Sequence, residues 1–185
     1  MMRINAKTYG TGLIALGGAG LSFSKYIKEM EYTIDTLAID SNPSELNASA
    51  IEKTLQIPLK ADNGRQKFNY RTKRQLHKFL KKNKQICVVS GLGGETSFHL
   101  LPDLMEIICE NVYIQLHVVY FFPFDFESDI RRERAKETVQ ISEIFADSVR
   151  VIKNQDLMEK DESFTKIVRK GHEIALSELK RLMER

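Results

Sequence analysis

The chain has 185 residues, of which 42% are hydrophobic and 29% are charged, a composition typical of a folded globular domain. Its net charge of +3 is too small to indicate nucleic-acid binding by itself, so we expect no nucleic-acid partner. Two cysteines, Cys87 and Cys109, are too few for a disulfide scaffold or a cysteine zinc site. The most apolar run, 118–124, is far shorter than the ~20 residues of a transmembrane helix, and no apolar signal segment is present. We therefore expect a cytoplasmic protein.

Strand-like and helix-like stretches alternate along the chain. The expected strands are 11–16, 34–39, 55–59, 86–90, 112–122 and 149–152. The expected helices are 21–30, a short one from Pro43, 71–83, 98–110, 130–145 and 163–183, with a loop at 60–69. Such alternation is typical of a mostly parallel sheet with helices on both faces. We predict one domain over residues 1–185 with an α/β fold, a Rossmann-like three-layer sandwich.

Two glycine-rich loops follow predicted strands and lead into predicted helices. The first contains Gly17, Gly18 and Gly20, and the second contains Gly93 and Gly94. Glycines let backbone N–H groups approach an anion, and a helix N-terminus adds partial positive charge. Two such loops in one sheet favour an elongated anion, such as the phosphate chain of a nucleotide. Tight turns without any ligand would explain the same glycines.

The first loop also partly fits the dinucleotide-binding fingerprint. Gly18 and Gly20 supply its Gly-x-Gly pair, and Asp40 follows about 20 residues later at the end of a predicted strand. The third glycine position is Phe23, which we expect to block the close approach of the helix to the strand. A dinucleotide-dependent enzyme therefore has only this partial match in its favour.

Five short segments share their order and spacing with the loops of a known family. They read GGAGLS from residue 17, DSNPSEL from 40, GGETSFH from 93, PFDFES from 123 and IKNQ from 152. Pro102 follows the third segment, and Arg131 and Ala135 follow the fourth. In these segments the chain resembles the tubulin/FtsZ family, and specifically the N-terminal GTP-binding domain of its bacterial cell-division members. The resemblance implies a role in cell division or cytoskeletal assembly.

The resemblance implies a site for GTP or GDP built from these segments. The phosphates would be bound by the backbone of five glycines, namely Gly17, Gly18, Gly20, Gly93 and Gly94. Thr96 would also contact the β- and γ-phosphates, and Ser22 stands where the family has an asparagine near the α-phosphate. Asp40 opens the second segment of the site.

Four further residues would bind the nucleoside by the same resemblance. Glu127 would accept hydrogen bonds from the ribose hydroxyls, and Arg131 would approach the ribose and the phosphates. Asn154 would read the guanine edge, and Phe164 would stack on the guanine ring. The four histidines have no ligand spacing, and no Ser-His-Asp or Cys-His arrangement can be argued, so we predict neither a metal site nor a catalytic set.

The chain departs from the family pattern at several positions. Glu95 replaces a glycine, and a carboxylate beside a triphosphate costs on the order of 1 kcal/mol through repulsion. Phe98 and His99 are bulky where the backbone must approach phosphate, and Val168 replaces the aspartate that reads guanine. The family's second domain, which carries the catalytic acidic loop, is not expected in this sequence. We therefore expect no efficient GTP hydrolysis.

Two surfaces have more than one interpretation. Residues 71–84 hold seven basic side chains and no acidic one, which fits a solvated helix face or a dock for an acidic partner or an anionic lipid surface. The terminal helix carries an apolar stripe near Leu176, Leu179, Leu182 and Met183. That stripe either packs on the chain's own sheet or stays exposed as an interface for self-association or for an FtsZ-like partner.

Three functions therefore compete at this stage. The first is a domain that binds a guanine nucleotide without hydrolysing it, which the segment 123–131 and Asn154 favour. The second is a degenerate homologue that binds no nucleotide and acts through protein contacts, which Glu95, Phe98 and Val168 favour. The third is the dinucleotide-dependent enzyme.

Overall fold

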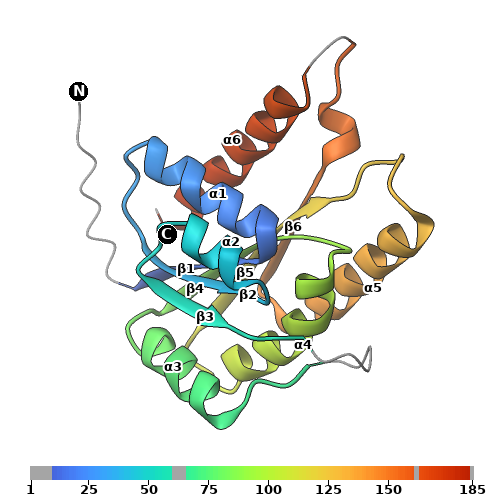
Figure 1. The fold of residues 1–185 in the computed structure, drawn as a ribbon. Coiled ribbons are helices and arrows are strands. Elements are labelled where there is room, and N and C mark those ends of the chain that lie inside the picture. The colour runs from blue at the N-terminus through green and yellow to red at the C-terminus, as the bar shows by residue number, and fades with distance from the viewer. Residues whose placement is uncertain (1–9, 60–65, 161–162, 184–185) are drawn as a thin grey trace.

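The computed structural model describes residues 10–59, 66–160 and 163–183, and within these residues six strands form one parallel sheet. The strand order is β3-β2-β1-β4-β5-β6 (Figure 1). The strands are β1 (Thr11–Leu16), β2 (Asp35–Asp40), β3 (Lys53–Gln56), β4 (Gln85–Gly91), β5 (Gln115–Phe122) and β6 (Ser148–Lys153). The helices are α1 (Gly17–Glu29), α2 (Pro43–Ala48), α3 (Tyr70–Leu80), α4 (Glu95–Cys109), α5 (Asp129–Phe145) and α6 (Phe164–Met183). A 3₁₀ turn, η1 (Asn154–Leu157), follows β6.

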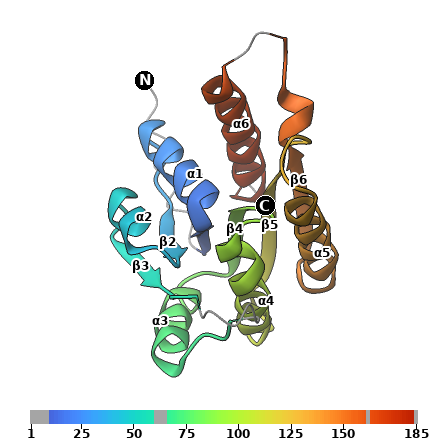
Figure 2. The ribbon, with the colours of Figure 1, turned by 45° about the vertical axis from the view of Figure 1, so that its right-hand side comes forward.

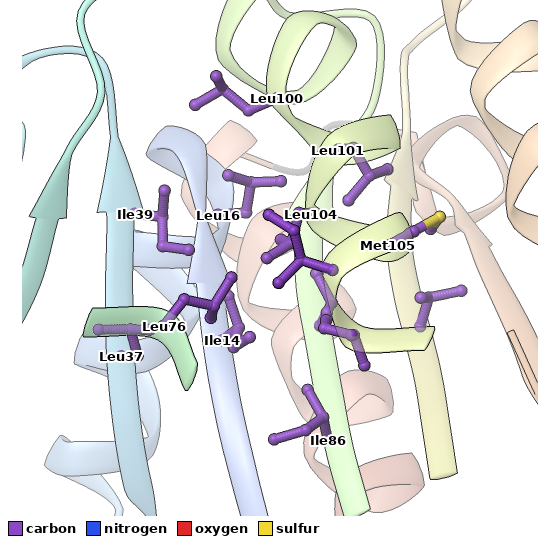
Figure 3. Packing of buried hydrophobic residues seen from close by; sticks show 14 of the residues in the cluster. Ile14, Leu16, Leu37, Ile39, Leu76, Ile86, Leu100, Leu101, Leu104 and Met105 are labelled. Atoms are coloured by element: carbon purple, nitrogen blue, oxygen red, sulfur yellow. The ribbon is translucent and has the colours of Figure 1, made fainter. Parts of the chain in front are cut away.

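Helices cover both faces of the sheet, which confirms the predicted three-layer α/β sandwich. The central strand β1 is buried along its whole length, as expected for a parallel strand with helices on both sides. On one face, Leu76 of α3 and Leu104 of α4 join the same core (Figure 3). Ala135 of α5 belongs to this core as well. On the other face, Tyr26 of α1 and Leu179 of α6 form a second core, and the two helices run side by side (Figure 2).

Polar side chains at the helix starts explain several element boundaries. Asn42 accepts a hydrogen bond from the Ser44 N–H at 2.9 Å and is followed by proline at the first position of α2. Asn69 accepts from the Thr72 N–H at 3.0 Å and starts α3. These caps satisfy N–H groups that the helix itself leaves free. They place α2 and α3 almost where the sequence predicts them.

Several boundaries differ from the sequence prediction by three or more residues or by a shift of a whole strand. Helix α1 begins at Gly17, so the first glycine loop is the first turn of the helix. The third strand is 53–56 rather than 55–59, and the predicted loop at 60–69 lies partly outside the described residues. Strand β5 begins at Gln115, because the Ile114 N–H closes a turn onto the Asn111 carbonyl at 2.9 Å. The residues before it point into solvent, with Tyr113 at 90% exposure.

The expectation that Phe23 keeps α1 away from the sheet is wrong. Phe23 is fully buried in the core shared with α6, on the side of the helix that faces this core. Gly20 allows the close approach instead, because a Cβ there would overlap the backbone carbonyl of Val89 in β4. The glycine that fits the helix against the sheet is therefore present, three residues earlier than the fingerprint places it.

Of the two interpretations of the apolar stripe on the terminal helix, the structure confirms packing on the chain's own sheet and not exposure as an interface. Leu176, Leu179 and Leu182 are at most 6% exposed and join the core that contains β4, β5 and β6 residues. No helix of the described residues is long and apolar enough to cross a membrane. The basic helix α3 likewise turns Leu76, Phe79 and Leu80 inward, and none of the ion pairs among the described residues uses a Lys or Arg of 71–84.

Candidate functional site

A cavity of about 450 Å³ opens at the carboxyl ends of β4 and β5. This is the edge at which parallel α/β sheets bind ligands. The cavity brings together five of the residues that the sequence predicts for the site. They are Ser22, Glu127, Arg131, Asn154 and Phe164, contributed by α1, the β5–α5 loop, α5, η1 and α6.

The β5–α5 loop is fixed by its own charged side chains. Glu127 accepts a hydrogen bond from the Phe124 N–H at 2.8 Å and forms an ion pair with Arg131 at 3.0 Å. Arg132 donates to the carbonyl of Glu127 at 2.6 Å and to that of Asp125. These contacts hold the loop in one shape beside the cavity. They also occupy the Glu127 carboxylate, whose predicted role is to bind ribose.

Aromatic rings form the outer end of the cavity. Phe124 and Phe126 stack at 5.0 Å between ring centroids, and Phe164 lies 5.5 Å from Phe124. Phe126 is 71% exposed and Phe164 is 61% exposed, although both are large apolar side chains. Exposed rings beside a cavity can stack on a planar ligand. Phe124 and Phe126 are not among the predicted site residues, and their alternation in PFDF is the sequence signal that could have found them.

The start of α1 leaves N–H groups available for an anion. Leu16 occupies the N-cap position, and no side chain caps this end of the helix. The first N–H groups of a helix lack partners within it and carry partial positive charge. Gly18 has no atom within 4 Å of the position that a Cβ would take, so its surroundings are open. Gly20 is a packing residue, because it is the contact point of α1 with β4.

The second glycine loop packs against both neighbouring segments. Gly93 has a left-handed backbone, with φ of +77°, and lies directly against the Arg131 backbone. Gly94 is the N-cap of α4 and lies near the Arg131 guanidinium. Thr96 shares a 2.9 Å hydrogen bond with Ser41, in the loop after β2. The loop is therefore in contact with the α5 side and the β2 side of the site.

Asp40 and Gly17 lie close to this second loop. Asp40 is only 3% exposed, and its Oδ1 accepts from the Asn42 N–H at 2.8 Å and from the Thr96 hydroxyl at 3.5 Å. A Cβ on Gly17, where φ is +70°, would lie 3.5 Å from the Ser97 hydroxyl. The two glycine-rich segments are thus neighbours in space. The cavity, Arg131 and these segments form one continuous region along the carboxyl edge of the sheet.

The unusual residues of the second loop form a cluster of their own. Glu95 forms an ion pair with Arg134 and a 2.9 Å hydrogen bond with His99. The Arg134 guanidinium also lies 4.7 Å from the centre of the Phe98 ring. The hydrogen bonds from Arg134 and His99 hold the pKa of Glu95 below its ordinary value. The Glu95 carboxylate, which was expected to repel phosphate, is therefore compensated by a cation of the same chain.

His172 is the functional candidate that the sequence analysis missed. It lines the cavity and is only 6% exposed. Phe23, Tyr26 and Phe121 surround its ring at centroid distances of 5.3 to 5.9 Å. Burial among these groups lowers its pKa to about 4, so the imidazole is neutral near pH 7. Its spacing of eight from Phe164, with Val168 between them, was the available signal.

The comparisons with known proteins agree with this geometry. No protein-family profile matches the sequence. The cell division protein FtsZ of Mycoplasmopsis pulmonis is 30% identical to the chain over 80 residues, which are 43% of this chain and 20% of that protein. The match therefore spans a fifth of that relative's length.

Solved structures match over nearly the whole chain. An FtsZ dimer of M. jannaschii has a TM-score of 0.78 and 20% identity, covering 98% of this chain and 56% of that one. CetZ2 of Haloferax volcanii, solved as a protofilament bound to GTPγS, has a TM-score of 0.73 and 16% identity, with coverages of 94% and 58%. The chain thus spans little more than half the length of these structures. Its fold is that of the tubulin/FtsZ proteins.

Proposed function

We propose that this chain is an FtsZ-like domain that binds GTP or GDP in the cavity beside Phe164 and works in cytoskeletal or cell-division assembly. The observation that carries the proposal is the continuous site along the carboxyl edge of the sheet. Aromatic rings stand at one end of it, and the uncapped start of α1 stands beside it. Planar bases stack on aromatic rings, and phosphates bind helix N-termini.

We also propose that the domain by itself hydrolyses GTP inefficiently. Activation of a water molecule needs a general base within hydrogen-bond reach of it. Among the described residues that line the cavity, Glu127 is the only carboxylate, and it is held by Arg131 and the Phe124 N–H. His172 is neutral, but it lies among aromatic rings on α6 rather than beside the glycine loops.

One observation favours the alternative, a homologue that binds no nucleotide and acts as an interaction protein. The described lining of the cavity includes Gly91 and Leu92 but neither Gly93 nor Gly94, against which Arg131 packs. A phosphate chain contacting Gly93 would require Arg131 to move. Self-association or binding to an FtsZ-like partner remains a prediction, and it would need a surface other than the buried stripe of α6.

Calorimetric titration of GDP, GTP, pyrophosphate and NAD into the purified chain tests the proposal. We expect micromolar binding of GDP and GTP and no binding of NAD. Phe164→Ala should weaken GDP binding at least about fivefold, because it removes a stacking surface worth ~1–3 kcal/mol. Ile144→Ala is the matched control, since Ile144 is 79% exposed on α5 and is not among the residues that line the cavity. The absence of GDP and GTP binding at millimolar concentration would overturn the proposal, and rapid phosphate release from GTP would overturn its second part.

A further inference from the structure

His172 is a buried polar side chain whose ring nitrogens have no hydrogen-bond partner among the described residues. Among the described residues, only His99 Nδ1 is both fully enclosed and without a hydrogen bond. The ring nitrogens of His172 therefore keep some accessible surface. Because Phe23, Tyr26 and Phe121 pack around the ring, the space left to them is the cavity that His172 lines.

The neutral imidazole can act either as a donor or as an acceptor. One ring nitrogen of a neutral histidine carries a hydrogen and the other carries a lone pair, and the two tautomers exchange these roles. Because the nitrogens reach the cavity, water can bond them when no ligand is bound, and no group of the described residues competes for them. A ligand that enters the cavity can replace this water with a polar group of its own. His172 is thus poised for a polar group of a ligand.

The position of His172 on α6 suggests which part of a ligand it meets. Phe164, Val168 and His172 are spaced by four residues and all line the cavity. Four residues advance a helix by about 6 Å, and helical side chains tilt toward the N-terminus of the helix. The ring of His172 therefore leans toward the turn of Val168. A planar base stacked on Phe164 would have its inner edge beside this turn, where Val168 offers no hydrogen bond.

We propose that His172 hydrogen-bonds the inner edge of the purine base and so positions the bound nucleotide. This inference rests on the proposed nucleotide site and names the residue that reads the base within it. The lone pair accepts from the N1–H of guanine, and the other tautomer donates to the N1 of adenine. A carboxylate at position 168 could only accept, whereas the imidazole adapts to either base. The ligand class is therefore a purine nucleotide, and His172 by itself does not discriminate strongly between guanine and adenine.

Two substitutions at this position separate the polar role from the packing role. His172→Phe keeps an aromatic ring among Phe23, Tyr26 and Phe121 but removes both nitrogens. His172→Gln keeps a donor and an acceptor on a side chain of similar length. Thermal unfolding of each variant checks that the domain remains folded. Displacement of a fluorescent GDP by GDP, ADP and pyrophosphate then measures the contributions of base and phosphate separately.

We expect His172→Phe to weaken GDP and ADP binding at least tenfold each and to leave pyrophosphate binding unchanged. His172→Gln should keep the affinity for GDP within about threefold of the unsubstituted chain. Unchanged GDP binding by a folded His172→Phe variant would overturn the inference while leaving the proposed function intact. An equal loss of pyrophosphate binding would also overturn it, since it would indicate a purely structural role. If the unsubstituted chain binds no nucleotide, both the inference and the proposed function fail.

Discussion

The two glycine-rich segments have the same place in the topology but use their glycines differently. In the first, Gly20 lets α1 approach β4, and Gly18 faces open space. In the second, Gly93 takes a left-handed backbone against Arg131, and the next helix starts with the charged Glu95. The first segment is thus defined by close packing and open N–H groups, and the second by a turn and an ion pair. The neighbours of a glycine, rather than the glycine itself, decide what it does.

In the first segment, we expect Gly20→Ala to cause the largest loss in the free energy of unfolding. The added Cβ would overlap the Val89 carbonyl, and Val89 is a fully buried residue of a central strand that cannot move aside. Overpacking of this kind costs typically 1–3 kcal/mol and more where the backbone is rigid, so we expect a loss of at least about 3 kcal/mol. Urea unfolding measures the change.

Gly18→Ala is the control within the same helical turn. Its Cβ would meet nothing within 4 Å, and alanine in a helix is favoured over glycine by up to about 1 kcal/mol. We expect this variant to be as stable as the unsubstituted chain or slightly more stable. Similar losses from both variants would show that the turn tolerates no side chain at all, and the assignment of Gly20 alone as the packing glycine would be wrong.

A comparable loss, at least about 3 kcal/mol, is expected from Gly93→Ala in the second segment. A left-handed backbone costs a non-glycine residue roughly 1–2 kcal/mol, and the new Cβ would also overlap the backbone carbonyl of Arg131. Gly94→Ala should cost less than about 1 kcal/mol, because its Cβ would come no closer than 3.8 Å to the Arg131 guanidinium. A larger loss of unfolding free energy for Gly94→Ala than for Gly93→Ala, measured by chemical unfolding, would contradict this interpretation of the turn.

The same contrast explains which features could be predicted from the sequence. The sheet was predictable because its central strands are short apolar runs, such as the fully buried stretch that contains Leu13 and Ile14. The place of the site was predictable because parallel strands end at one edge, where Ser22, Glu127 and Phe164 line one cavity. Those predictions need only local pattern and topology.

Contacts between distant segments could not be predicted in this way. Glu95 and Arg134 are 39 residues apart, and only the packing of α4 on α5 brings the two charges together. The burial of the α6 stripe likewise depends on how the helix lies on the sheet, which its own periodicity does not specify. The surroundings of His172 likewise come from distant segments, since Tyr26 of α1 and Phe121 of β5 pack around its ring. Sequence patterns report which face is apolar, but not what lies opposite that face.

The smallest expected effect, and the sharpest test of the second segment, comes from Glu95→Gln. The pKa of Glu95 is lowered in the folded state, so the charged carboxylate stabilises the fold above its ordinary pKa of 4.5 and loses this contribution as the pH falls through the lowered value. The carboxylate is 58% exposed, so we expect a loss of only about 0.5 kcal/mol at pH 7. The difference between the variant and the unsubstituted chain should therefore close on acidification below pH 4.5, as urea unfolding across this range would show.

The same variant decides whether Glu95 opposes a bound phosphate chain. An uncompensated carboxylate would repel a triphosphate by on the order of 1 kcal/mol, so its removal would raise GTP affinity about fivefold. Because Arg134 and His99 already bind this carboxylate, we expect Glu95→Gln to raise GTP affinity less than about threefold in calorimetric titrations. A rise of about fivefold or more would mean that the ion pair does not shield the charge. The second segment would then be a barrier to nucleotide, whereas the first would remain open to it.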